Sequence, residues 1–143
     1  MTAFVVDANV ALKWCLPEAG ESFVLQARRL LESHSRGELR FLVPDLFWAE
    51  FGNVMWKAIR KGKTSPSQTA AALGLIRELG IPTFSSADLL PEALNIALTH
   101  DCSLYASLYV ALAVRFRTEM ITADERLANL LAAHLPVKWL GAL

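Results

Sequence analysis

The chain of 143 residues lacks the features of secreted and membrane proteins. Its two cysteines, Cys15 and Cys102, form neither a CxxC pair nor a Cys/His pattern, which favours ordinary core thiols in a reducing compartment. No basic segment opens the chain, and the first apolar run stops at Asp7, so we expect no signal peptide. No stretch approaches the roughly 20 apolar residues that cross a bilayer. We therefore expect a cytoplasmic protein without a membrane partner.

The formal net charge is zero, since the chain has 14 lysines and arginines and 14 aspartates and glutamates. This balance argues against a strongly basic protein that holds nucleic acid mainly by attraction to phosphates. It leaves room for an enzyme with a local basic rim, or for a partner that supplies the missing charge. Repeats, low-complexity tracts and linkers are missing too, so we interpret residues 1–143 as a single domain.

Short apolar runs alternate with longer helical patterns, which is typical of an α/β fold with a parallel sheet. The runs lack polar alternation, as expected for strands that are covered on both faces. We predict a three-layer α/β/α sandwich with a mostly parallel sheet of about five strands. The predicted strands are 2–7, 41–43, 82–84, 119–122 and 136–139, and the predicted helices are 8–16, 20–35, 45–61, 66–80, 87–99, 103–117 and 124–134.

Three acidic residues from separate thirds of the chain stand at positions that the fold would bury. Asp7 and Asp124 each follow a predicted strand, and the carboxyl edge of an open parallel sheet is where α/β proteins place their sites. Glu50 lies about a turn inside a helix whose neighbouring residues are apolar. Because burying isolated carboxylates is costly, the three suggest a shared divalent cation, which prefers oxygen ligands.

Each acid also has a simpler interpretation. Asp7 can cap the helix that begins at Ala8, and Asp124 can be a first-turn acid that the helix dipole favours. Thr122 with Glu125 three residues later fits a capping box. Glu50 can be half of a buried ion pair. The shared position of two acids at strand ends, and the lack of a capping role for Glu50, favour the metal site.

Four blocks of sequence together resemble the PIN-domain family, and in particular VapC-type toxin ribonucleases. They are Val5-Val6-Asp7-Ala8-Asn9, Ala49-Glu50, the helical run from Tyr105-Ala106-Ser107-Leu108-Tyr109 to Ala113, and Ile121-Thr122-Ala123-Asp124-Glu125-Arg126-Leu127. The resemblance covers the whole chain, in order and at suitable spacing.

This resemblance implies an endoribonuclease that depends on Mg²⁺ or Mn²⁺ and acts as the toxin of a type II toxin–antitoxin module. Asp7, Glu50 and Asp124 match the family's first, second and last acids, and Asn9 and Thr122 match the small polar residues that support them. We expect a structured RNA substrate of the tRNA or rRNA class and a homodimer. A small antitoxin is expected along segments 10–33 and 45–56, with a basic tail that reaches the acids.

Ala106 departs from the family pattern, because the motif in this helix usually carries an aspartate that binds metal. A methyl group cannot bind a metal, so we expect weakened activity. Asp101, five residues upstream, is a possible substitute ligand, although its position also suits the dipole of the following helix. The alternative function is a catalytically degenerate PIN-like protein that acts by binding RNA or an antitoxin.

A local basic cluster at the end of the third predicted helix is a candidate RNA contact. It consists of Lys57, Arg60, Lys61 and Lys63, although a solvated helix end would have the same composition. A phosphoacceptor receiver domain also places acids at strand ends. That fold requires paired acids after the first strand and a late lysine, whereas Asp7 stands alone and Lys138 lies inside the last predicted strand.

Overall fold

The computed structural model describes residues 2–16 and 22–143 of the chain. Its helices and strands follow one another as an alternating α/β pattern. In chain order they are β1 (Thr2–Val6), α1 (Ala8–Cys15), α2 (Val24–Ser35), β2 (Leu39–Pro44), α3 (Leu46–Arg60), α4 (Pro66–Glu78), β3 (Thr83–Phe84), α5 (Ser86–His100), α6 (Leu104–Arg115), β4 (Glu119–Thr122), α7 (Glu125–Leu131), β5 (Val137–Trp139) and the short 3₁₀ helix η2 (Leu140–Ala142).

The sheet has five strands in the order β3-β2-β1-β4-β5, and every pair is parallel. β1 lies at its centre, where Val5 pairs with Leu42 of β2 and Met120 of β4. All three of these side chains are buried. The order reverses direction between β1 and β4, and such a switch point is where open α/β sheets bind their ligands.

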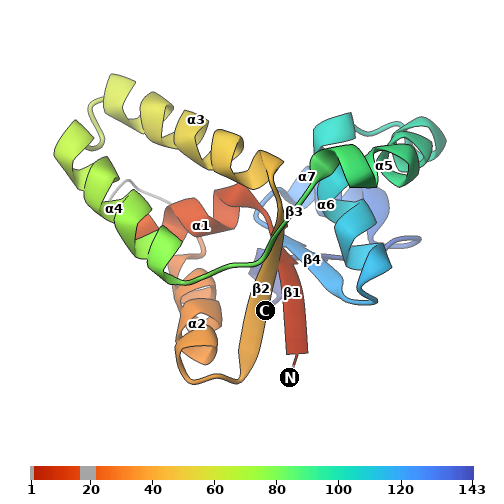
Figure 1. Ribbon diagram of the computed structural model, residues 1–143, viewed down its shortest axis with the longest axis horizontal. Helices are drawn as coiled ribbons and strands as arrows, with labels where there is room; N and C mark the ends of the chain where they lie inside the picture. Colours follow the sequence, from red (N-terminus) through yellow and green to blue (C-terminus); the bar gives the residue numbers. More distant parts are fainter. Residues whose placement is uncertain (1, 17–21) are drawn as a thin grey trace.

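Helices cover both faces of the sheet, with α1 to α4 on one side and α5 to α7 on the other (Figure 1). This confirms the predicted three-layer arrangement, and the sheet is entirely parallel. Residues 107–113 of α6 are all buried, because this helix packs against β1, β2 and β4 beneath α5. Within the described ranges no single helix is long and apolar enough to span a bilayer. α5 and α6 would pass that test only together, across a bend of 116°.

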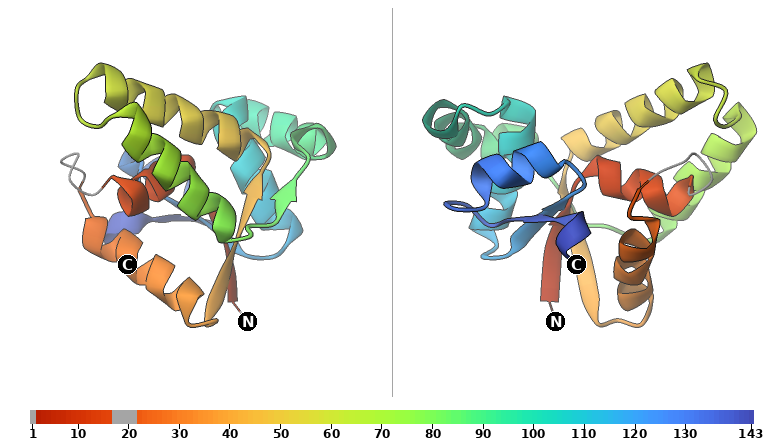
Figure 2. Two further views of the ribbon diagram at one scale, coloured as in Figure 1. Left: turned by 60° about the vertical axis from the view of Figure 1, so that its left-hand side comes forward. Right: turned by 180° about the vertical axis from the view of Figure 1, so that it is seen from behind.

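α3 and α4 form an arm that extends away from the sheet, as both views of Figure 2 show. α5 and the start of α6 stand on the opposite side of the sheet's carboxyl edge. The base of α3 is fixed by Phe47 and Phe51, which are buried and stack on each other at 5.9 Å. The molecule therefore has two walls that rise on either side of the edge where β1 and β4 end.

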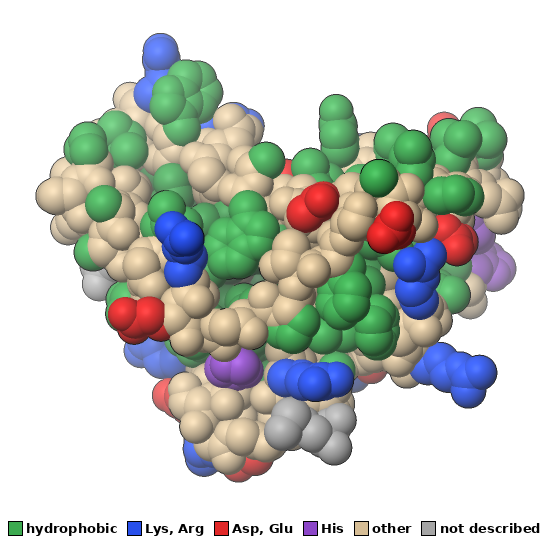
Figure 3. Space-filling view, viewed as in Figure 1, with side chains coloured by type: hydrophobic (Ala, Val, Ile, Leu, Met, Phe, Trp, Pro, Cys, Tyr) green, Lys and Arg blue, Asp and Glu red, His purple; other side chains and the backbone are tan. Residues whose placement is uncertain are grey.

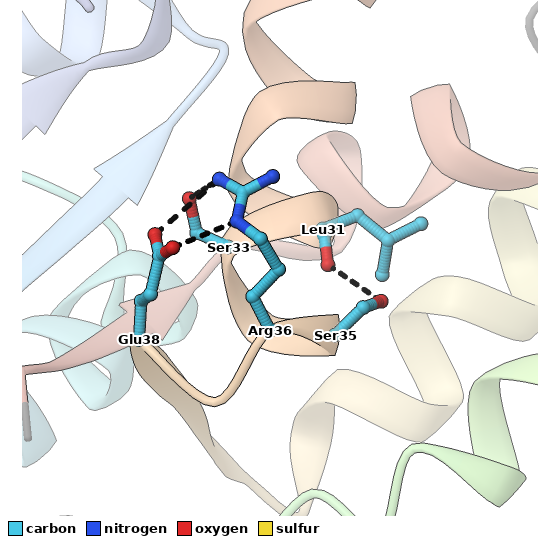
Figure 4. A network of polar contacts seen from close by, with 5 residues as sticks. All are labelled: Leu31, Ser33, Ser35, Arg36 and Glu38. Atoms are coloured by element: carbon cyan, nitrogen blue, oxygen red, sulfur yellow. Dashed lines mark hydrogen bonds and ion pairs between the residues drawn. The ribbon is translucent and has the colours of Figure 1, made fainter.

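The turn from α2 into β2 shows how local chemistry ends a helix. Gly37 has φ of +72°, a left-handed conformation that costs glycine little. Arg36 donates from its guanidinium to Glu38 at 2.7 Å and to Ser33 at 3.5 Å (Figure 4). Because both charged side chains are more than half exposed, water screens this pair and it adds little to stability.

The predicted elements are all present, and their boundaries differ most at α2 and α7. The predicted helix 20–35 begins at Val24 in the structure, and positions 20 and 21 lie outside the described residues. The predicted helix 124–134 ends at Leu131. Past Leu131 the chain tightens into a turn, in which the His134 amide donates to the Leu131 carbonyl at 3.0 Å.

Candidate active site

Asp7 lies at the carboxyl end of the central strand. Its backbone amide donates to the carbonyl of Ile121 at 3.0 Å, which holds the ends of β1 and β4 together. Its carboxylate accepts a hydrogen bond from the Thr122 hydroxyl at 2.9 Å. Burial raises the pKa of Asp7 to about 6, against the lowering effect of the Thr122 hydrogen bond, and the charge of Glu50 raises it further. A cation beside Asp7 would relieve this unfavourable burial.

The Thr122 hydroxyl is the centre of a polar network that joins β1 to β4. Thr122 is completely buried. While it donates to Asp7, its oxygen accepts from the amide of Asp124 at 3.1 Å and from the side-chain nitrogen of Asn9 at 3.4 Å. The side-chain carbonyl oxygen of Asn9 in turn accepts a hydrogen bond from the backbone amide of Ala123 at 3.1 Å. A hydroxyl has one hydrogen and two lone pairs, so all the bonding capacity of Thr122 is used.

Asp124 caps α7, and its side chain accepts from the amide of Leu127 at 3.1 Å. The predicted capping box from Thr122 to Glu125 is therefore wrong. The Thr122 side chain cannot cap the helix because it is buried among the polar groups of the site. This capping hydrogen bond uses only one of the two carboxylate oxygens of Asp124.

Glu50 receives a hydrogen bond from a residue that our sequence analysis did not assign to the site. The phenol of Tyr109, buried in α6, donates to the Glu50 carboxylate at 2.7 Å. Burial raises the pKa of Tyr109, as do the charges of Asp7 and Glu50, so the phenol remains a donor. The sequence signal was available, since Tyr109 follows Tyr105 by four residues in the block that resembles the family motif.

The three acids line one cavity of 340 Å³ at the carboxyl edge of the sheet. Figure 3 shows acidic surface at the hollow between the two walls. Among the residues that the structure describes, no lysine or arginine lines this cavity. Its lining consists of Asp7, Ala8, Asn9, Glu50, Asn53, Val54, Ser103, Tyr105, Ala106, Tyr109, Asp124 and Leu127.

Ala106 lies in the first turn of α6 and faces the same cavity. Its amide donates to the Ser103 side chain, which caps the helix. Asp101 is elsewhere: it ends α5 in a left-handed conformation with φ of 52°, is exposed, and is not among the described residues that line the cavity. Asp101 therefore belongs to the end of α5 and not to the start of the following helix. The Asp101 carboxylate would have to move to reach the three acids.

The composition of the cavity fits a hard divalent cation. It offers carboxylate and amide oxygens, one desolvated carboxylate with a raised pKa, and no basic side chain among the described residues. In the described part of the chain, however, no three His, Cys, Asp or Glu side chains are grouped closely enough to form a complete metal site. A cation bound here would keep several water ligands, as Mg²⁺ commonly does.

The basic candidates lie on and after the last turns of α3, beyond the residues of that helix that line the cavity. Lys57 and Arg60 are in the last turns of α3, and Lys61 and Lys63 follow it; all four are exposed. None of them lines the acidic cavity as far as the described residues define it. Asn53, three residues after Glu50 on α3, does line it, and our sequence analysis did not single it out.

Comparison with known proteins gives consistent relatives. Residues 4–131 match the family described as PIN domain. Ribonuclease VapC3 from Pyrobaculum aerophilum is 31% identical over 127 residues, which cover 87% of this chain and 92% of that protein. Ribonuclease VapC1 from Mycobacterium tuberculosis is 32% identical over 128 residues, or 90% of each chain.

Solved structures share the fold at lower sequence identity. The crystal structure of PAE2754 from Pyrobaculum aerophilum aligns with a TM-score of 0.71 at 19% identity, over 99% of this chain and 85% of that one. A toxin–antitoxin complex from Klebsiella pneumoniae contains a chain that aligns with a TM-score of 0.61 at 18% identity, over 96% of both. At these identities the likeness shows the fold alone.

Proposed function

The chain belongs to the PIN-domain family, and on this basis we propose that it is a VapC-type ribonuclease, the toxin of a toxin–antitoxin module. The observation that carries the proposal is the convergence of Asp7, Glu50 and Asp124 on one cavity. Asp7 follows β1, Glu50 lies in α3 and Asp124 caps α7, and a shared site would account for three distant segments that bring carboxylates together. The relatives named ribonucleases support RNA as the substrate.

We propose Mg²⁺ or Mn²⁺ as the cofactor, held by Asp7, Glu50 and Asp124. Such an ion supplies a nucleophile from bound water and stabilises charge on the phosphate under attack. The chain's own contribution is orientation. Tyr109 fixes the Glu50 carboxylate by its 2.7 Å bond, and Thr122 fixes Asp7 while two further partners, the Asp124 amide and the Asn9 side chain, hold Thr122. Hydrogen bonds of this kind to ligand side chains set their direction and basicity.

Ala106 leads us to propose that the chain as given is a weak nuclease. Its methyl group faces the cavity at the position where the resemblance implies an aspartate, and the described acids do not form a complete metal site by themselves. A carboxylate at this position would add a charged oxygen ligand from the first turn of α6. The alternative, a degenerate protein that binds RNA or an antitoxin without cleaving, rests on the same observation.

The substitution Ala106→Asp tests the proposal of a weak nuclease against the alternative of a degenerate protein. We expect it to raise affinity for Mn²⁺ by more than tenfold, since the loss of even a supporting group typically costs ~10–100-fold, and to raise cleavage of structured RNA of the tRNA or rRNA class. The measurements are calorimetric Mn²⁺ titration and cleavage followed on gels. Asp7→Asn in the Ala106→Asp background is the inactive control, and Asp101→Asn tests the substitute ligand.

Two results would count against this account. If the given chain already cleaves efficiently and Ala106→Asp changes nothing, the role assigned to position 106 is wrong. If Ala106→Asp binds Mn²⁺ tightly and still fails to cleave any RNA, the degenerate alternative is correct.

We also propose a small antitoxin partner for the early helices. Apolar cavities are available there: one of 540 Å³ is lined by Trp48, Gly52, Leu73 and Arg77, and one of 350 Å³ lies between α1, α2 and α4. A basic tail on the antitoxin would complement the acidic cavity. Co-expression with the product of the neighbouring gene should give a complex that copurifies. If the chain does not copurify with that product, the proposal is contradicted.

The homodimer remains our proposal, and exposed leucines on α5 support it. Leu90, Leu94 and Leu98 recur every fourth residue and are 44%, 50% and 77% exposed, so one face of the helix is apolar. Light scattering on the purified chain would give its mass directly. The cytoplasmic location expected from the sequence is compatible with an RNA substrate.

A further inference from the structure

The arm of the molecule is basic, although the whole chain is neutral. Residues 51–77, which cover most of α3 and all but the end of α4, contain five lysines and arginines and no acidic residue. The remainder of the chain therefore holds nine basic and 14 acidic residues. Figure 3 shows blue side chains beside apolar ones at the tip of this arm. A neutral protein with this separation of charge can attract a polyanion to one wall of its site.

Trp56 is the unusual side chain of the arm. It is 54% exposed, whereas Trp14, Trp48 and Trp139 are partly buried against the core. The Arg60 guanidinium lies 5.2 Å from the centre of its ring. A large exposed aromatic ring contacted by an arginine is the combination that proteins use to stack unpaired nucleobases beside a held phosphate.

The position of Trp56 connects it to the acidic cavity. α3 lines the cavity with Glu50, Asn53 and Val54. Trp56 follows Asn53 by three residues and Lys57 follows Val54 by three, so both lie on adjoining faces about 4.5 Å further along the helix axis. A strand whose phosphate sits among the acids would thus reach Trp56 and Lys57 within a turn of helix.

We propose that Trp56 is a base-stacking platform that positions an unpaired nucleotide next to the bond to be cleaved, with Lys57 and Arg60 on the neighbouring phosphates. This inference rests on the ribonuclease function proposed above and narrows its substrate class to RNA with a single-stranded stretch. RNA is favoured at Trp56 itself because the cationic Lys57 and Arg60 flank it and complement a phosphate backbone, whereas the antitoxin proposed above would occupy the neighbouring apolar cavity lined by Trp48, Gly52, Leu73 and Arg77.

Binding of a short single-stranded RNA that carries 2-aminopurine tests the proposal, since stacking quenches the fluorescence of this base. The assay uses the full chain in a chelator, so that binding is measured without cleavage. We expect quenching with the parent and its loss in Trp56→Ala, together with affinity lower by ~5- to 150-fold. Trp56→Phe should restore most of both. Leu130→Ala, which shortens an apolar side chain of similar exposure (50%) on α7, is the matched control.

Salt dependence separates stacking from charge. Trp56→Ala should leave the slope of log affinity against log salt unchanged, whereas Arg60→Gln should reduce it by about 0.7, the value for one phosphate contact on a single strand. If Trp56→Ala and the parent bind RNA and quench the fluorescence equally, the proposal that Trp56 stacks a base is wrong. Cleavage by Ala106→Asp would still test the proposed ribonuclease function. Loss of antitoxin binding alone in Trp56→Ala would assign the ring to a protein partner. No RNA binding by any variant, with no cleavage by Ala106→Asp, would overturn both proposals.

Discussion

Replacing Asp7 with asparagine should stabilise the metal-free protein at neutral pH. The pKa of Asp7 is raised from 3.8 to about 6, mainly by burial and also by the charge of Glu50. A difference of about two pH units corresponds to about 3 kcal/mol of unfavourable interaction when the carboxyl is ionised. Asparagine keeps an oxygen that accepts the Thr122 hydrogen bond but carries no charge. The substitution therefore removes the cost of the buried charge and little else.

The pH dependence gives this prediction its sign. Because the folded-state pKa lies above the unfolded value of 3.8, the contribution of Asp7 to stability is fully present below that pH and is lost as the pH rises through about 6. The parent should lose stability relative to Asp7→Asn across this window. We expect a small difference at about pH 4 and up to about 3 kcal/mol in favour of the variant at about pH 7.5.

Urea unfolding in a chelator, repeated at several pH values, measures this difference. Asp101→Asn is the matched control, since it also replaces a carboxylate by an amide but at an exposed position outside the cavity. Addition of Mn²⁺ should then stabilise the parent more than Asp7→Asn, because the ion binds the folded state through the carboxylate. A variant that is less stable than the parent at about pH 7.5 in chelator would refute the argument.

Two further substitutions test the groups that orient the acids. Thr122→Val should lower the free energy of unfolding by about 1–3 kcal/mol, measured by urea unfolding, because it leaves the Asn9 side chain and the Asp124 amide without their acceptor. A loss below the error of that measurement would show that water replaces the hydroxyl. Tyr109→Phe should weaken Mn²⁺ binding in the Ala106→Asp background by about tenfold or more, measured by calorimetry. Unchanged affinity would mean that Glu50 is held without the phenol.

The sequence predicts the sheet well because burial on both faces leaves a clear signal. β4 matches the predicted range 119–122, and the others differ by two residues or fewer at each end. The convergence of Asp7 and Asp124 on one cavity also follows from their place after strands, since parallel strands end at the same edge. Both acids follow a strand, and the order of strands and acids can be read directly from the sequence.

Contacts between distant side chains were harder to predict. The bond from Tyr109 to Glu50 joins residues 59 positions apart and depends on how α6 packs across the sheet toward α3. Thr122 looked like a helix cap because its spacing to Glu125 is correct, but its hydroxyl is committed to Asp7 inside the fold. Zero net charge gave no sign of a basic arm, because composition reports a sum, although the local cluster from Lys57 to Lys63 already pointed to it.

The pairing of β1 with β4 has a consequence for synthesis of the protein. Asp7 and Asn9 are made first, yet their partner Thr122 follows 115 and 113 residues later, and Asp124 comes later still. A ribosome must therefore translate the 115 residues beyond Asp7, up to Thr122, before these groups can meet, and contacts of such long sequence separation form late in folding. A nascent chain that still lacks Thr122 and Asp124 has an incomplete site. Any partner that captures the early helices as they emerge would reach the enzyme before its site is complete.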